Sequence, residues 1–211
     1  MPNKFFVVSG SYIFQSAKRC VTKNAQRIFL MIGAVLSFSA NSAPSVYTLN
    51  NDGKSQVISA FDCTPSFSGK AALGDNKYVH VWECEINDSV KYAIYKTSYT
   101  SRYGFTFSSK NEVVDFFTKY LANKVSSYSQ NTRMSDLRYV ITSTGYSSKE
   151  SAYADYFISY KWDGKLRMAQ QGRFLFQNGY IADWSVTSPM ELGVAADEFN
   201  SYVKYFKIKI Q

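Results

Sequence analysis

The chain has 211 residues, of which 45% are hydrophobic and 19% are charged, and its formal net charge is +8. The length fits one domain of ordinary size, and the apolar content excludes a largely disordered chain. Five basic residues and no acidic ones precede residue 43, so residues 43–211 keep 19 basic and 16 acidic side chains, a net charge of +3. These basic residues are dispersed along the chain, which removes the support for nucleic-acid binding.

The beginning of the chain has the layout of a secretory signal peptide. Basic residues precede an apolar run from Ile28 to Leu36, and no acidic residue occurs before Asp52. The run is shorter than the roughly 20 apolar residues that span a bilayer. An uncleaved membrane anchor is therefore the weaker alternative.

Ala40 and Ser42 have small side chains at the two positions that matter for signal cleavage, so we expect the chain to be cut after Ser42. Translation starts either at Met1 or, with a more compact lead-in, at Val21. Residues 1–42 are then a signal peptide. Residues 43–211 form a single exported domain, located in the periplasm or secreted by a bacterium, with no stable membrane anchor after cleavage.

The cysteines point to the same compartment. Cys20 precedes the apolar run and leaves with the signal peptide, so the exported domain keeps Cys63 and Cys84. In an oxidising compartment these two residues predict a disulfide that contributes roughly 3 kcal/mol in the chain-entropy model. A redox-active pair would have the close Cys-x-x-Cys spacing, and no cysteine begins the exported domain to carry a lipid.

Alternating segments in the first half predict two hairpins and one helix. Val46–Leu49 and Val57–Phe61 flank a turn at residues 50–53, and Tyr78–Ile86 and Val90–Tyr99 flank Asn87-Asp88-Ser89. Ser109 and Glu112 then have the spacing of a capping box at the start of a helix. Apolar residues recur at helical spacing after it: Val113, Phe116, Phe117, Tyr120, Leu121 and Val125.

The second half predicts a meander and a terminal helix. A strand at Leu137–Thr144 is followed by three strands joined at Asp163-Gly164 and Asn178-Gly179, because these dipeptides tolerate the positive φ angles of two-residue hairpin turns. Ser188-Pro189-Met190-Glu191 has the pattern of a helix start. The stripe that follows consists of Leu192, Ala195, Phe199, Tyr202, Val203 and Phe206.

This order predicts an α+β fold, in which an antiparallel sheet of hairpins and a C-terminal meander packs against two amphipathic helices. From Val57 to Ile208 the chain resembles the PsbP-like α/β/α group of small, mostly exported proteins. The resemblance rests on element order and on the ending Tyr180-Ile181-Ala182-Asp183-Trp184-Ser185-Val186, which leads into Ser188 and the helix around Phe199 to Phe206. It implies accessory or binding roles more than catalysis.

Few residues in the sequence suggest catalysis or metal binding. His80 is the only histidine, so a multi-histidine metal site is excluded, and pairing of the cysteines removes the usual thiolate ligands of zinc. Glu83 and Glu85 share a strand face, which is typical of a solvated surface. No phosphate-binding loop, nucleophile elbow or calcium loop occurs. We expect no catalytic residue, cofactor or metal.

The candidate interaction surface lies in the meander. Tyr and Trp are favoured at protein interfaces, although their abundance here also fits sheet propensity and core packing. Basic residues of the neighbouring strand could rim such a patch. The candidate residues are Tyr153, Tyr156, Tyr160, Trp162, Arg167 and Arg173.

The sequence favours a non-catalytic bacterial envelope protein that binds another envelope or secreted protein, as an inhibitor or immunity protein or as an assembly accessory. One alternative is the binding of a sugar or an amphiphile in an aromatic-lined groove between sheet and helix. A further alternative is a carboxylate hydrolase, which needs Glu83 or Glu85 in a cleft with a second acid opposite.

Overall fold

The computed structural model describes residues 45–50, 54–74, 77–100 and 105–210. The chain divides into two units, residues 1–41 and 42–211, and all described residues belong to the second unit. The expected signal peptide and its cleavage site after Ser42 lie outside the described residues.

Two antiparallel sheets and two α-helices make up the described fold, which confirms the α+β class. The smaller sheet has the strand order β1-β2-β10, with β1 at Ser45–Asn50, β2 at Ser55–Phe61 and β10 at Lys207–Ile210. The larger sheet has the order β3-β4-β5-β9-β8-β7-β6. Its strands are β3 (Ser66–Gly74), β4 (Lys77–Asn87), β5 (Tyr92–Thr100), β6 (Met134–Ser148), β7 (Ser151–Trp162), β8 (Leu166–Gln177) and β9 (Tyr180–Pro189).

The predicted hairpins are present. β1 pairs with β2, β4 pairs with β5, and the meander β7-β8-β9 turns at the two expected dipeptides. Asp163 and Gly164 have φ angles of 51° and 68°, and Asn178 and Gly179 have φ angles of 48° and 81°. Positive φ at both central residues is the geometry of the turn that matches strand twist.

The first helix begins where the capping box predicts. α1 spans Lys110–Ser129; the Glu112 amide donates to the Ser109 hydroxyl at 3.3 Å, and the Ser108 amide donates to the Glu112 carboxylate at 2.7 Å. Its buried face carries Val113, Phe117, Leu121 and Val125. This face packs on the large sheet with Phe174 and Phe176 of β8, in one of two hydrophobic clusters.

The C-terminal region departs from the predicted helix. α2 covers only Val194–Tyr202, after a 3-10 turn at Met190–Leu192 and Gly193 at φ 65°. Ser188 remains in β9, yet its hydroxyl accepts a hydrogen bond from the Ala195 amide at 2.9 Å. The predicted cap therefore contacts the helix from seven residues upstream.

After α2, a second 3-10 turn (Val203–Tyr205) leads into β10, which the sequence had not indicated. Lys207-Ile208-Lys209-Ile210 alternates in polarity, and Ile208 is buried opposite Val57 of β2. Pairing with β2 therefore ends the helix. The sequence does not indicate β3 either, because its Gly and Ala residues have low strand propensity.

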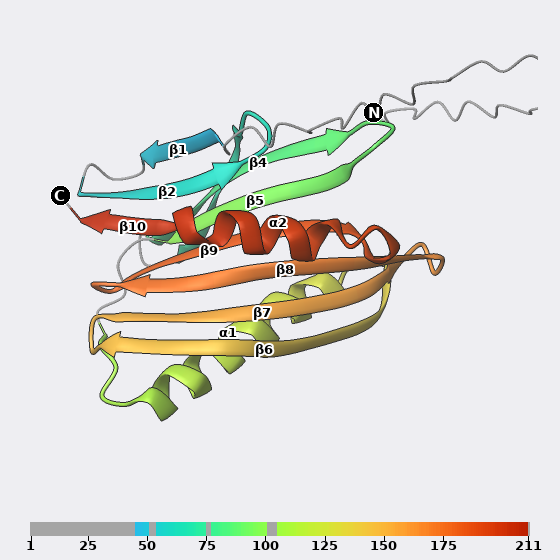
Figure 1. Cartoon of the computed structure of the whole chain (residues 1–211). Helices are drawn as coiled ribbons and strands as arrows, with labels where there is room; N and C mark the ends of the chain where they lie inside the picture. Colours follow the sequence, from blue (N-terminus) through green and yellow to red (C-terminus); the bar gives the residue numbers. More distant parts are fainter. Residues whose placement is uncertain (1–44, 51–53, 75–76, 101–104, 211) are drawn as a thin grey trace, which may run out of the picture. The chain divides into compact units, whose positions relative to one another are not determined.

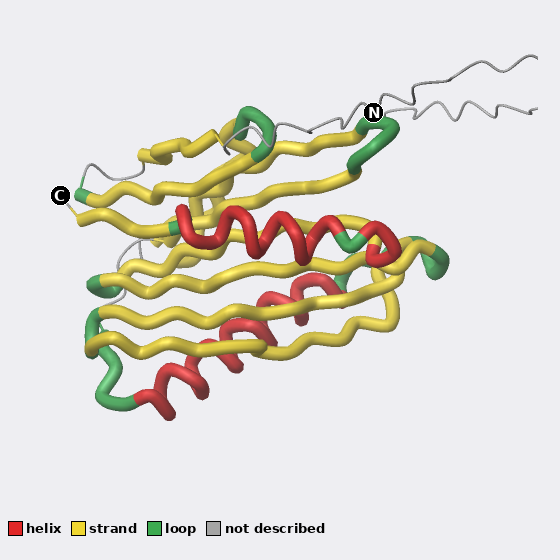
Figure 2. Tube along the Cα trace, viewed as in Figure 1, coloured by secondary structure: helices red, strands yellow, loops and turns green. Residues whose placement is uncertain are grey.

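The two α-helices lie on opposite faces of the large sheet and over different strands (Figure 1, Figure 2). α1 contacts one face at β6 and β7, whereas α2 contacts the other face at β8 and β9. The small sheet lies on the same side as α2, where Phe61 of β2 packs with Tyr95 of β5 and the Trp184 indole donates to the Ala60 carbonyl at 3.2 Å. The predicted disulfide between Cys63, just after β2, and Cys84 of β4 joins the two sheets. The α2-side face of β6 and β7 is left open in the described part of the chain.

Candidate binding face

The six residues predicted as an interaction surface fall on both faces of the meander. Alternation along β7 places Tyr156 and Tyr160 beneath α1, where they are 1% and 8% exposed. Trp162 also packs at the edge of that cluster, with the Arg133 guanidinium 4.4 Å from its ring. Tyr156 and Tyr160 are core residues, which fits the packing interpretation of these aromatics.

Tyr153, Arg167 and Arg173 lie on the other side, on a surface that we name the open face. Cross-strand partners share a face of a sheet, and the register pairs Val140 with Phe157 and Phe157 with Gln171. The open face includes these residues of β6, β7 and β8 that point away from α1: Arg138, Val140, Ser143, Tyr153, Asp155, Phe157, Ser159, Lys161, Arg167, Ala169, Gln171 and Arg173. Val140 of β6, at the edge of the sheet, is 52% exposed.

At one end of the open face the charges are balanced. Arg173 donates to both oxygens of Asp155, at 2.5 and 2.8 Å, and Ser143 donates to the same carboxylate at 2.7 Å. The Arg173 guanidinium lies 4.3 Å from the centre of the Tyr153 ring. A Cβ on Gly145 would come within 2.1 Å of that ring, so the glycine lets Tyr153 lie flat over β6.

At the other end three cations surround one carboxylate. We name this group the Asp136 cluster: Asp136 lies 3.5 Å from Arg138 and 3.6 Å from both Lys161 and Arg167. These distances exceed those of ordinary charged hydrogen bonds. Asp136 has φ 52° beside the register shift between Ser135 and Arg138, and such a bulge redirects a side chain. The cluster keeps two positive charges in excess.

A small pocket adjoins the open face at the start of α2. Its volume is about 170 Å³, and its lining residues are Phe157, Ala169, Gln171, Ser188, Pro189, Met190, Gly193, Ala195 and Ala196. Small-molecule sites usually measure about 300–1,000 Å³, whereas an apolar cavity of about 150 Å³ accommodates benzene. The pocket therefore has room for one aromatic or aliphatic side chain. Met190 and Leu192 beside it are 44% and 51% exposed.

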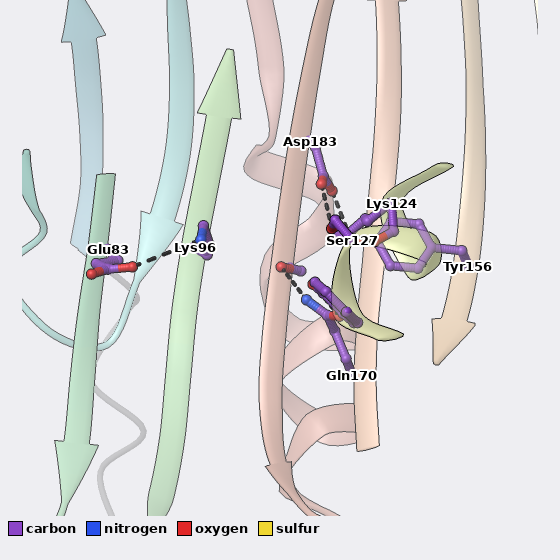
Figure 3. Close-up of polar contacts among 9 residues, drawn as sticks. Glu83, Lys96, Lys124, Ser127, Tyr156, Gln170 and Asp183 are labelled. Atoms are coloured by element: carbon purple, nitrogen blue, oxygen red, sulfur yellow. Dashed lines mark hydrogen bonds and ion pairs between the residues drawn. The ribbon is translucent and has the colours of Figure 1, made fainter. Parts of the chain in front are cut away.

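A polar network lies on the opposite face, beneath α1 (Figure 3). The Lys124 ammonium donates to Asp183 at 2.5 Å and to the Tyr156 hydroxyl at 2.6 Å, and Tyr156 donates to Asp183 at 2.7 Å. Tyr128 of α1 reaches Gln170, which donates to Ser185 at 2.9 Å. The network ties α1 to β7, β8 and β9.

Lys124 and Tyr156 of this network both have raised pKa values. Burial alone would lower the pKa of Lys124, but the Asp183 carboxylate offsets this effect and the pKa is raised. Burial, and then Asp183, raise the pKa of Tyr156 well above 10. An ammonium and a phenol that keep their protons are poor nucleophiles and bases near neutral pH. We therefore interpret the network as a set of contacts that fixes the position of α1 on the sheet, and not as a site of proton transfer.

Glu83 and Glu85 lie apart from this network. Glu83 of β4 is 4.0 Å from Lys96 of β5 (Figure 3). The side chains of Glu83 and Lys96 are both nearly half exposed. The His80 ring stacks on Trp82 with 6.1 Å between ring centres. Within the described ranges, no three His, Cys, Asp or Glu side chains are grouped as metal ligands. Over the same ranges, no helix has the length and apolarity to cross a membrane.

Sequence reasoning named Tyr153, Arg167 and Arg173 but missed the Asp136 cluster and the pocket. The cluster depends on a bulge, and the pocket depends on where α2 meets β8 and β9, so neither has a local sequence signal. The alternation of β7 could have separated Tyr153 from Tyr156 and Tyr160. No protein-family model matches the sequence, and no curated protein is significantly similar to it.

Proposed function

We propose that the protein is a non-catalytic, exported bacterial envelope protein that binds another protein through the open face. It acts as an inhibitor of a secreted toxin or enzyme, or as an accessory to an envelope assembly. The observation that carries the proposal is the 170 Å³ pocket beside exposed basic and apolar residues of the open face. Protein interfaces concentrate their binding energy where a large side chain enters such a pocket.

Two observations favour a protein partner over a sugar or an amphiphile. The pocket is too small for a ligand of ordinary size. The interface between α1 and the sheet is packed with aromatic rings: Phe107 and Phe176 are 4.7 Å apart, and Tyr120 and Phe174 are 4.9 Å apart. The space between the sheet and α1 is therefore occupied by side chains, and the small pocket beside α2 is the space that remains for a partner.

The non-catalytic assignment draws on the state of the acidic and basic groups. Asp183 is engaged by Lys124 and Tyr156, and Glu83 faces Lys96 on an exposed strand. The pocket residues include no acidic side chain. A hydrolase that uses two carboxylates would need both of them in one cleft.

The test is affinity capture from the envelope fraction of the source cells, with the disulfide-intact protein as bait. Ala196→Leu fills the pocket, and Ala122→Leu introduces the same change on α1 as a matched control. We expect the wild type and Ala122→Leu to retain the same stoichiometric partner and Ala196→Leu to lose it. Circular dichroism and thermal unfolding establish that both variants are folded. Equal capture by all three proteins, or capture by none, would refute the proposal.

A further inference from the structure

We infer that the partner presents an extended segment in which one large apolar side chain enters the pocket while acidic side chains contact the Asp136 cluster. This inference rests on the proposed function and adds the chemistry of the partner. It depends on an asymmetry of charge along the open face and on the position of the pocket between the two ends.

The asymmetry lies in how the cations are neutralised. Arg173 forms a bidentate pair with Asp155, and its side chain is 21% exposed. In the Asp136 cluster, Arg138 and Arg167 share Asp136 with Lys161, and their side chains are 73% and 49% exposed. Exposed cations that share one carboxylate keep donors for a second anion, so the surplus positive charge is concentrated at this end. Complementary charge across an interface selects partners and orients them.

The pocket and the cluster lie on the same strands and on the same face. Ala169 lines the pocket and lies two residues from Arg167, which is about 7 Å along β8. Phe157 lines the pocket and lies four residues from Lys161, which is about 13 Å along β7. An extended partner segment has the same rise per residue. Acidic side chains two and four residues from the apolar anchor therefore reach the cluster.

Two other occupants account for fewer of these features. An anionic bilayer would neutralise the exposed cations but would leave the pocket unused. A second copy of the chain would have to bring both an apolar anchor and acidic residues to this face. The combination of a pocket for one side chain with a local surplus of cations fits an acidic segment of a different protein.

Four synthetic peptides, each with a Gly and Ser backbone sequence into which a few test residues are placed, test the inference. The first carries one Phe with Glu two and four residues before it, the second has Lys in place of Glu, the third has Gly in place of Phe, and the fourth reverses the order of the first. Binding to the disulfide-intact protein is measured by nuclear magnetic resonance titration. We expect the first or the fourth peptide to bind about tenfold more tightly than the Lys and Gly peptides, and to bind more weakly as salt is raised.

Protein variants locate the contacts. Arg138→Glu/Arg167→Glu and Ala196→Leu should each weaken the binding of the preferred peptide by about tenfold. Lys110→Glu/Lys119→Glu reverses two exposed charges on α1 and should have no effect. Equal binding of Glu and Lys peptides, or no binding of either Glu peptide, overturns the inference. So do binding to anionic phosphatidylglycerol vesicles instead of the peptides, and self-association that Arg138→Glu/Arg167→Glu abolishes.

The outcomes separate this inference from the proposed function. If a captured envelope partner is lost with Ala196→Leu but retained by Arg138→Glu/Arg167→Glu, the protein-binding function stands and the acidic segment is excluded. If Ala196→Leu retains everything that the wild type captures, the binding face itself is wrong.

Discussion

At the scale of single residues, Lys124 and Asp183 form an ion pair that is largely removed from solvent. The two side chains are 15% and 10% exposed, and each also contacts Tyr156. A charge that is removed from water is costly unless its partner remains in place. The pair connects α1 to β9 and does not by itself show a functional site.

Lys124→Met should lower the free energy of unfolding by about 3 kcal/mol, because it leaves the Asp183 carboxylate buried without its cation. Lys124→Met/Asp183→Leu removes both charges and should recover part of this loss. Urea unfolding followed by circular dichroism measures both values. Lys119→Met, on the exposed side of α1, is the control and should change the free energy by less than about 0.5 kcal/mol. A single variant as stable as the wild type would contradict this account of the network.

At the scale of elements, local turn chemistry was predictable and long-range pairing was not. Asp163-Gly164 and Asn178-Gly179 specify their turns through two residues each, and Ser109 and Glu112 specify the start of α1. β10 forms because β2, more than a hundred residues earlier in the chain, offers an edge for Ile208. The predicted helical stripe ends at Phe206 and β10 begins at Lys207, where pairing with β2 favours a strand over a longer helix.

Ile208→Ala should lower the free energy of unfolding by about 2–4 kcal/mol, because Ile208 is 9% exposed and packs in the core shared with α2. Lys209→Ala is the matched control; its side chain is exposed on the alternate side of β10, and little change is expected. Chemical denaturation of the two variants distinguishes a strand from a continued helix. Similar losses in both variants would argue against the strand register.

At the scale of the whole molecule, the open face could be predicted only in part. Tyr153, Arg167 and Arg173 were recognisable as aromatic and basic residues on neighbouring strands. Their separation from Tyr156 and Tyr160 requires knowledge of which face α1 covers. The grouping of Asp136 with three cations and the 170 Å³ pocket arise where several elements meet. No short stretch of sequence encodes such features.

The disulfide acts on the whole molecule because Cys63 follows β2 of the small sheet and Cys84 belongs to β4 of the large sheet. Cys63→Ala/Cys84→Ala should lower the free energy of unfolding by roughly 3 kcal/mol, since the crosslink restricts the unfolded chain. Guanidinium unfolding of the variant beside the oxidised wild type gives the difference. Reduction of the wild type before unfolding should produce a similar loss. A variant of unchanged stability would mean that packing alone joins the sheets.

Alkaline pH should weaken the fold. Burial raises the pKa of several tyrosines. These tyrosines are Tyr92, Tyr95, Tyr156, Tyr160 and Tyr202. For Lys124, burial lowers the pKa, but the Asp183 carboxylate opposes this effect, and the pKa is raised. In the unfolded chain tyrosine loses its proton near its ordinary pKa of 10.0, and lysine near 10.5. The folded state therefore binds more protons than the unfolded chain above these values. The stabilisation that these groups contribute is fully present below about pH 10 and is lost as the pH rises.

Each such group contributes up to about 1.4 kcal/mol per pH unit. Urea unfolding between pH 8 and pH 11.5 should show a constant free energy at first and then a steep fall. Tyr156→Phe removes one titrating group, so its decline above pH 10 should be shallower by the equivalent of about one proton. A wild-type free energy that stays constant to pH 11 would refute the prediction.

The position of β9 links the two halves of the fold. It pairs with β5 on one side and β8 on the other, and residues 180–188 are all buried. Ile181 belongs to the core beneath α1, whereas Trp184 belongs to the core beneath α2 and the small sheet. Both cores therefore include side chains of β9. The amide hydrogens of β9 should thus exchange with deuterated water only when the whole domain unfolds, and they report its global free energy directly.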